Sequence, residues 1–290
     1  MNIQTNYTNK LNNNSLSFSA NKSEQTNIND LRKEFKSEIN RNAYYGKDLV
    51  KTSNTKSEIP EDLKILFEDL KGKEGKEFAE VAYKGLIKHY KLEGVVPDKL
   101  YWDKTCKGSN LDIVSDYRWY ENNVVLYEDL FLNSGKTKEE QFGFIAHEVT
   151  HMKQLVNIMQ TEDLPLTTVA TAFAIFDFNS TLSRNPVAQQ QFRQAKQNGK
   201  EKEYTRFMLG NLARKNYGEL STSFKDALNS PKHPLSSPNG QKALRDLDSW
   251  SKYNSHDWNT YSGILVEKEA FDEENKMRAI YRNYMNKKKR

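Results

Sequence analysis

The length, composition and charge of this 290-residue chain exclude several broad classes of protein. With 36% hydrophobic residues, including 14 Phe and 15 Tyr, the chain has enough bulky apolar material for one sizeable core and is not disordered throughout. Its net charge of +5 is concentrated at residues 287–290, so the basic balance does not predict a nucleic-acid-binding face. No apolar run approaches the ~20 residues that a membrane-spanning helix needs, which predicts no membrane span.

The cysteine count and the first residues bear on the cellular compartment. Cys106 is the single cysteine, so an internal disulfide is excluded, as is typical of proteins in a reducing compartment. Residues 1–7 lack a basic segment followed by an apolar one, so no secretory signal is predicted. The expected location is therefore cytoplasmic by default, with non-classical export left open.

The first part of the chain is predicted to contain a tail, a short helix and a linker. Residues 1–28 are rich in Asn, Ser, Thr and Lys, and they carry too little apolar surface to offset the entropy of ordering. They are expected to be a disordered polar tail. Residues 29–58 are expected to hold a helix capped by Asn29 or Asp30, followed by a polar linker.

Residues 59–285 are predicted to form one α+β domain that is mostly helical. Helices are expected to begin near Pro60 and to cover 77–92, and a small antiparallel sheet should precede the helix that starts after Thr137. The expected strands cover 99–102, 111–120 and 124–131. The later candidate helices cover 165–178, 186–198, 202–216, 240–253 and 261–285. Residues 286–290 are expected to form a basic tail.

The most informative segment is H-E-x-x-H, formed by His147, Glu148 and His151 on the helix after Thr137. Thr137 and Glu140 predict a capping box that starts this helix. Residues four apart lie on one helix face, where two imidazoles can bind one ion at ~2.0–2.1 Å each. Glu148 lies beside them, where a carboxylate can take a proton from water activated by the metal.

A catalytic zinc usually takes a third protein ligand. Residues 154 and 157 are Gln and Asn, which excludes a third His at close spacing. Glu267 is the best candidate, because it shares a helix face with apolar residues and a carboxylate there is costly to bury unless it is paired or binds a metal. Glu269 lies on a more polar face and is the alternative ligand. Asp272 or Glu269 could hold a ligand His through its second nitrogen.

The H-E-x-x-H-x-x-Q helix and the later E-x-E-A segment, residues 147–154 and 267–270, resemble the Glu-zincin (gluzincin) metallopeptidases of bacteria. The resemblance implies one Zn²⁺ per chain, held by His147, His151 and Glu267, with Glu148 as the general base. It therefore implies a zincin-like metallopeptidase that cleaves a protein or peptide substrate.

The chain departs from the compact members of this family in two ways. The 115 residues between His151 and Glu267 exceed the usual separation and imply a helical insertion near 160–260. Phe271 stands where related motifs often carry Asp or Asn.

The resemblance also implies a strand that binds substrate and a donor to the oxyanion. Zincins commonly bind extended substrate along an edge strand, and residues 123–128 are the candidate here. Tyr253, His256 and Tyr261 precede the Glu267 helix and are candidate oxyanion donors, with no preference among them.

Two other interpretations remain open on sequence alone. A non-catalytic metal-binding or protein-interaction module would close the coordination sphere with a fourth side chain. A helical protein without a metal would place His147 and Glu267 more than ~10 Å apart, too far to share one ion. The substrate, the choice between endopeptidase and exopeptidase, and the oligomeric state do not follow from the sequence.

Overall fold

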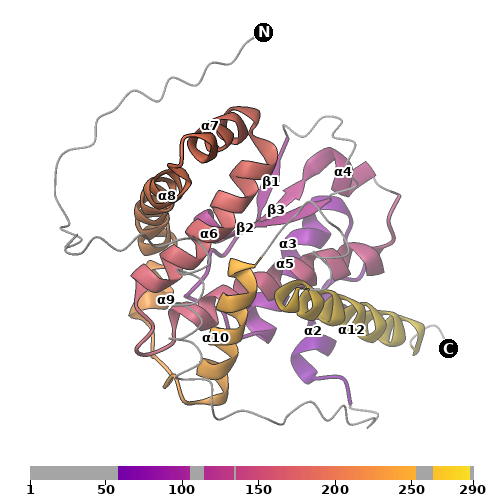
Figure 1. Ribbon diagram of the computed structural model, residues 1–290. Coiled ribbons are helices and arrows are strands. Elements are labelled where there is room, and N and C mark those ends of the chain that lie inside the picture. Colours follow the sequence, from indigo (N-terminus) through magenta and orange to yellow (C-terminus); the bar gives the residue numbers. More distant parts are fainter. Residues whose placement is uncertain (1–57, 105–113, 134, 253–263, 288–290) are drawn as a thin grey trace.

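The computed structural model describes residues 58–104, 114–133, 135–252 and 264–287. The expected tail at 1–28, nearly all of the segment 29–58, most of the basic tail and Cys106 lie outside these residues. The described chain is mostly helical with a small sheet near its start, which confirms the predicted α+β class (Figure 1).

The elements follow one another in the order that the sequence suggests, except that residues 128–131, expected to belong to the strand at 124–131, lie in a short helix. Before the sheet come two helices, α2 (Glu61–Asp69) and α3 (Gly75–His89). The sheet contains β1 (Tyr101–Asp103), β2 (Ser115–Arg118) and β3 (Asn123–Tyr127), with a short 3-10 helix, η1 (Trp119–Glu121), between the last two. The helices that follow are α4 (Glu128–Asn133), α5 (Lys138–Met159), α6 (Leu166–Arg184), α7 (Pro186–Gln197), α8 (Glu201–Ser223), α9 (Lys225–Asn229), α10 (Pro238–Ser251) and α12 (Leu265–Lys287).

The sheet is mixed, which corrects the expectation of an antiparallel one. Its strand order is β1-β3-β2, with β1 parallel to β3 and β2 antiparallel to it. The reversal between β2 and β3 passes through η1 and Asn122, which adopts the left-handed conformation at φ 48°. β3 is thus the central strand and, among the strands that the structure describes, β2 lies at an edge, so the candidate substrate strand at 123–128 is not at an edge. The complete burial of Val124, Val125 and Leu126 is typical of such a central position.

Helix α5 runs through the middle of the fold and carries the H-E-x-x-H segment. The predicted capping box is confirmed, because the Thr137 side chain accepts from the Glu140 backbone and the Glu140 side chain accepts from the Thr137 backbone. Helix α12 lies against α5, and Phe142 of α5 stacks on Tyr281 of α12. The two helices approach closely at Gly143, where an added Cβ would lie 2.6 Å from side-chain carbons of Arg278.

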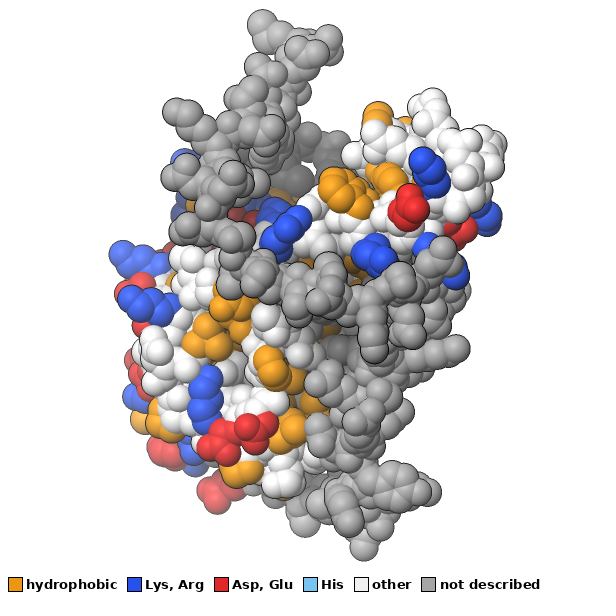
Figure 2. All heavy atoms as spheres, turned by 60° about the vertical axis from the view of Figure 1, so that its left-hand side comes forward, with side chains coloured by type: hydrophobic (Ala, Val, Ile, Leu, Met, Phe, Trp, Pro, Cys, Tyr) orange, Lys and Arg blue, Asp and Glu red, His pale blue; other side chains and the backbone are white. Residues whose placement is uncertain are grey.

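The predicted insertion near 160–260 contains helices α6 to α10. Helices α6, α7 and α8 lie together on one side of the molecule and share a small apolar cluster around Phe178 and Leu209 (Figure 1). On their outer face Val187 and Phe207 are exposed, and Figure 2 shows hydrophobic side chains beside Lys and Arg there. Helix α10 instead packs against α5, α6 and α12, so this part of the insertion belongs to the main core.

Candidate metal centre

The structure brings His147, His151 and Glu267 together, although 115 residues separate the second from the third. The Nε2 atoms of the two histidines lie 3.2 Å apart. Glu267 Oε2 lies 3.5 Å from Nε2 of His147 and 3.4 Å from Nε2 of His151. All three side chains are buried, so a buried His-His-Glu group capable of holding a metal ion is present.

Two helices supply this group. Positions 147 and 151 are one helical turn apart on α5, which places both imidazoles on the face that meets α12. Glu267 lies in the first turn of α12, on the same buried face as Ala270, Met277 and Tyr281. Its side chain is as buried as these apolar neighbours, at 1% exposed. The helix-face argument that selected Glu267 over Glu269 therefore agrees with the geometry.

The spacing of the three atoms matches a tetrahedral metal site. Bonds of ~2.0–2.1 Å around a tetrahedral centre separate neighbouring ligand atoms by about 3.3–3.4 Å. The observed separations are 3.2, 3.4 and 3.5 Å. Among the described residues, no fourth His, Cys, Asp or Glu joins the group, which leaves one tetrahedral position for another ligand.

The electrostatics of the group also favour a cation at its centre. Glu267 Oε2 is fully buried and has no hydrogen-bond donor of good geometry among the described residues. Three lone-pair atoms so close together repel one another unless a proton or a metal lies between them. Burial and an unpaired acceptor are thus both explained by an ion at this point.

The pKa values of the two histidines and of Glu267 also indicate that the group favours a positive charge at its centre. Burial alone would lower the pKa of His147, but the Glu267 and Glu274 carboxylates raise it to about 10. Burial also opposes a charged His151, and Glu267 outweighs that effect and raises its pKa. Burial would raise the pKa of Glu267, whereas the two histidines hold it down at about 2. Without a metal, protons on the histidines balance Glu267, and a metal would replace them.

Glu148 is buried beside the two histidines, and a residue of the sheet donates a hydrogen bond to its carboxylate. The Ser115 hydroxyl, on edge strand β2, donates to Glu148 Oε1 at 2.8 Å. Burial raises the pKa of Glu148, and the positive charges of His147 and His151 oppose this rise. A carboxylate with a raised pKa is well suited to accept and return a proton near neutral pH.

Each histidine has a second contact through Nδ1. His151 Nδ1 lies 3.0 Å from Gln154 Oε1, and His147 Nδ1 lies 3.4 Å from Glu274 Oε2, an ion-pair distance. The expectation that Asp272 or Glu269 would contact a ligand His directly is wrong. Asp272 forms an ion pair with Lys268. Glu269 accepts a hydrogen bond from Gln154, which in turn contacts His151.

Aromatic rings complete the surroundings of the two histidines. Phe271 packs edge-on against His147 with ring centroids 4.6 Å apart, and Trp250 of α10 packs against His151 at 5.4 Å. Phe271 thus supplies an apolar contact to His147, and Glu274, three residues later on α12, supplies a polar one. Such apolar walls limit the access of water and strengthen the electrostatic interactions inside the centre.

Sequence reasoning missed Ser115, Glu274 and the role of Gln154 at this centre. Glu274 could have been found, because it lies seven residues after Glu267 on the same helix face. Ser115 could not, since its contact depends on the strand order. The candidate oxyanion donors Tyr253, His256 and Tyr261 lie outside the described residues and stay predictions.

Comparison of the chain with family models, with curated proteins and with solved structures gives no match. The metallopeptidase resemblance thus depends on the motif residues and their geometry alone. In the described part of the chain, no helix is long and apolar enough to cross a membrane, as expected from the sequence.

Proposed function

We propose that this protein is a zinc-dependent metallopeptidase whose metal is held by His147, His151 and Glu267. The observation that carries the proposal is the buried triangle of two imidazoles and one carboxylate, with the spacing of three tetrahedral ligands. Two His and one Glu are a ligand set typical of catalytic zinc in peptidases, whereas magnesium and calcium prefer oxygen ligands alone. The position without a protein ligand among the described residues supports a catalytic site over a structural one.

Zinc held here would supply Lewis acidity, which lowers the pKa of water toward ~7 and polarises a substrate carbonyl. Glu148 then acts as the general base: its carboxylate accepts the proton of the attacking water and returns it to the leaving amine. Ser115 orients the carboxylate of Glu148 by donating to its Oε1, and Oε2 takes no part in that hydrogen bond. Burial raises the pKa of Glu148, which favours this transfer.

The test compares the wild type with Glu148→Gln in two assays. One measures bound zinc by elemental analysis, and the other measures cleavage of a denatured protein and a peptide library by mass spectrometry. We expect the variant to retain zinc and to lose at least 10²- to 10⁴-fold in activity, the contribution typical of a general base. A zinc-loaded wild type that cleaves no peptide, or a variant with full activity, would contradict the proposal.

A further inference from the structure

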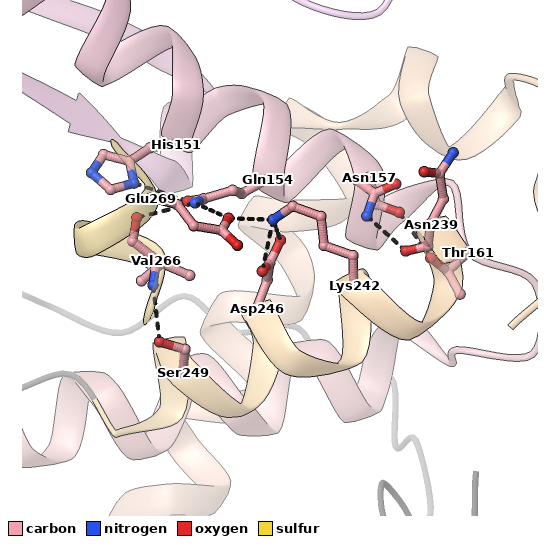
Figure 3. A network of polar contacts seen from close by, with 10 residues as sticks. All are labelled: His151, Gln154, Asn157, Thr161, Asn239, Lys242, Asp246, Ser249, Val266 and Glu269. Carbon is pink, nitrogen blue, oxygen red and sulfur yellow. Dashed lines mark hydrogen bonds and ion pairs between the residues drawn. The ribbon is translucent and has the colours of Figure 1, made fainter. Parts of the chain in front are cut away.

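Gln154 makes three polar contacts that fix how its amide is turned. It lies on α5, three residues after His151, and is 2% exposed. Its Nε2 donates to the Val266 carbonyl at 3.1 Å and to Glu269 Oε2 at 3.3 Å. Its Oε1 faces His151 Nδ1 at 3.0 Å (Figure 3).

This arrangement determines the tautomer of His151. An amide can often be turned either way, but here both partners of Nε2 are acceptors, so the NH₂ group must face them. Oε1 therefore points to His151, and since it can only accept, His151 Nδ1 must carry a hydrogen. The neutral ring then keeps its lone pair on Nε2, which faces His147 and Glu267.

We propose that Gln154 is a positioning residue that holds His151 in the form in which Nε2 binds the metal. The same amide holds the backbone carbonyl of Val266, the residue before Glu267, so it also locates the third ligand. One side chain thus links the two helices that carry the three ligands. The inference depends on the proposed metal centre but not on peptide cleavage.

Helix α10 supports this amide from outside the centre. Lys242 forms ion pairs with Glu269 and with Asp246, whose side chain is fully buried. The pair with Glu269 keeps the carboxylate next to Gln154 Nε2 (Figure 3). A second support comes from Ser249, whose Oγ accepts from the Val266 backbone N–H at 3.2 Å. Lys242 is therefore expected to act on the metal centre through Glu269 and Gln154.

The chain offers a matched control one turn further along α5. Asn157 joins α5 to α10, because its Nδ2 donates to the Asn239 carbonyl at 3.0 Å (Figure 3). Its contact is exposed and does not reach the ligands. Asn157→Ala therefore removes a side-chain amide contact between α5 and a neighbouring helix, α10 in place of α12, and leaves His151 untouched.

The experiment measures zinc affinity by competition with a chromogenic chelator and records the absorption spectrum of the cobalt-loaded protein. Gln154→Leu removes the acceptor from His151, and we expect a 10- to 100-fold loss of affinity, the range typical for such outer contacts, with a changed cobalt spectrum. Lys242→Met removes the ion pair with Glu269 and should cause a smaller loss than Gln154→Leu.

The outcomes separate this inference from the proposed function. If Gln154→Leu and Lys242→Met bind zinc as the wild type does, with the same cobalt spectrum, the inference is wrong while the metal centre stands. If Asn157→Ala loses as much affinity as Gln154→Leu, helix docking explains the effect and the positioning role is overturned. A wild type that binds no zinc overturns both, whereas zinc binding without peptidase activity overturns only the proposed function.

Discussion

In the metal-free protein, His147 is expected to keep a proton that zinc would replace, and its loss at alkaline pH should destabilise the fold. Burial alone would lower the pKa of His147, but Glu267 and Glu274 raise it from 6.5 to about 10. A group whose pKa is higher in the folded than in the unfolded chain contributes its full stability below the unfolded pKa. That contribution is lost as the pH rises through the folded pKa. The window for this loss therefore extends from pH 6.5 to about 10.

The size of the effect follows from the linkage between proton binding and folding. When the folded chain holds one proton that the unfolded chain does not, the free energy of unfolding falls by about 1.4 kcal/mol for each unit of rising pH. Over two pH units within the window, the free energy of unfolding should fall by up to about 2.7 kcal/mol. Since a domain of this kind is stable by only about 5–15 kcal/mol, the change is large enough to measure.

Urea unfolding followed by tryptophan fluorescence, in the presence of a chelator, measures this slope. Glu267→Gln is the matched control, because it removes the charge that raises the pKa of His147 and keeps the size of the side chain. The variant should show a shallower decline with pH than the wild type. With saturating zinc the wild-type slope should vanish, because the ligand nitrogens are then deprotonated across the window. Equal slopes for the metal-free wild type and Glu267→Gln would refute the reasoning.

Three further predictions concern the surroundings of the centre. Gly143→Ala should lower the free energy of unfolding, measured with urea, by about 1–3 kcal/mol, because the added Cβ would lie 2.6 Å from side-chain carbons of Arg278 on α12. Gly210→Ala is the control, because its Cβ would have no atom within 4 Å and should not destabilise the fold. Ser115→Ala removes a hydrogen bond that lowers the pKa of Glu148, so this pKa should rise and the acid limb of the pH–activity profile should move to higher pH. An acid limb at the same pH in both proteins would argue against Glu148 as the general base. Glu274→Gln should weaken zinc binding about 10-fold in chelator competition, because it removes the negative charge next to Nδ1 of the ligand His147. An unchanged zinc affinity would show that this contact is dispensable.

The elements that the sequence predicts best are those with a local physical cause. The α5 helix has a capping box at Thr137 and a long periodic pattern, and both depend on residues only a few positions apart. Glu267 was found for a similar reason, since its place on an apolar face of α12 is a property of that helix alone. These two local patterns were enough to predict residues that meet in space across 115 positions.

The order of the strands could not be predicted, because it depends on contacts between segments distant in the chain. The short separation of β2 and β3 indicates an antiparallel neighbour, but nothing local shows that β1 adds to the far side of β3 in parallel. The edge position of β2, and with it the contact of Ser115 with Glu148, follows only from that order.

The outer contacts of the histidines show where helix geometry could have been applied more strictly. Asp272 lies five residues after Glu267, which turns it well away from the buried face, and it is an exposed partner of Lys268. Glu274, seven residues after Glu267, returns to that face and lies against His147. The choice of Gln154 as the partner of His151 depends on the Val266 carbonyl, a tertiary contact that no sequence pattern reports.

The zinc content of the purified protein, measured beside Glu267→Ala and Glu269→Ala, tests the central claim most directly. We expect one zinc per chain in the wild type, loss or strong weakening of zinc binding in Glu267→Ala, and still one zinc per chain in Glu269→Ala, whose carboxylate lies outside the group of three ligands. No zinc in the wild type after zinc is supplied, or equal zinc in the wild type and Glu267→Ala, would contradict it.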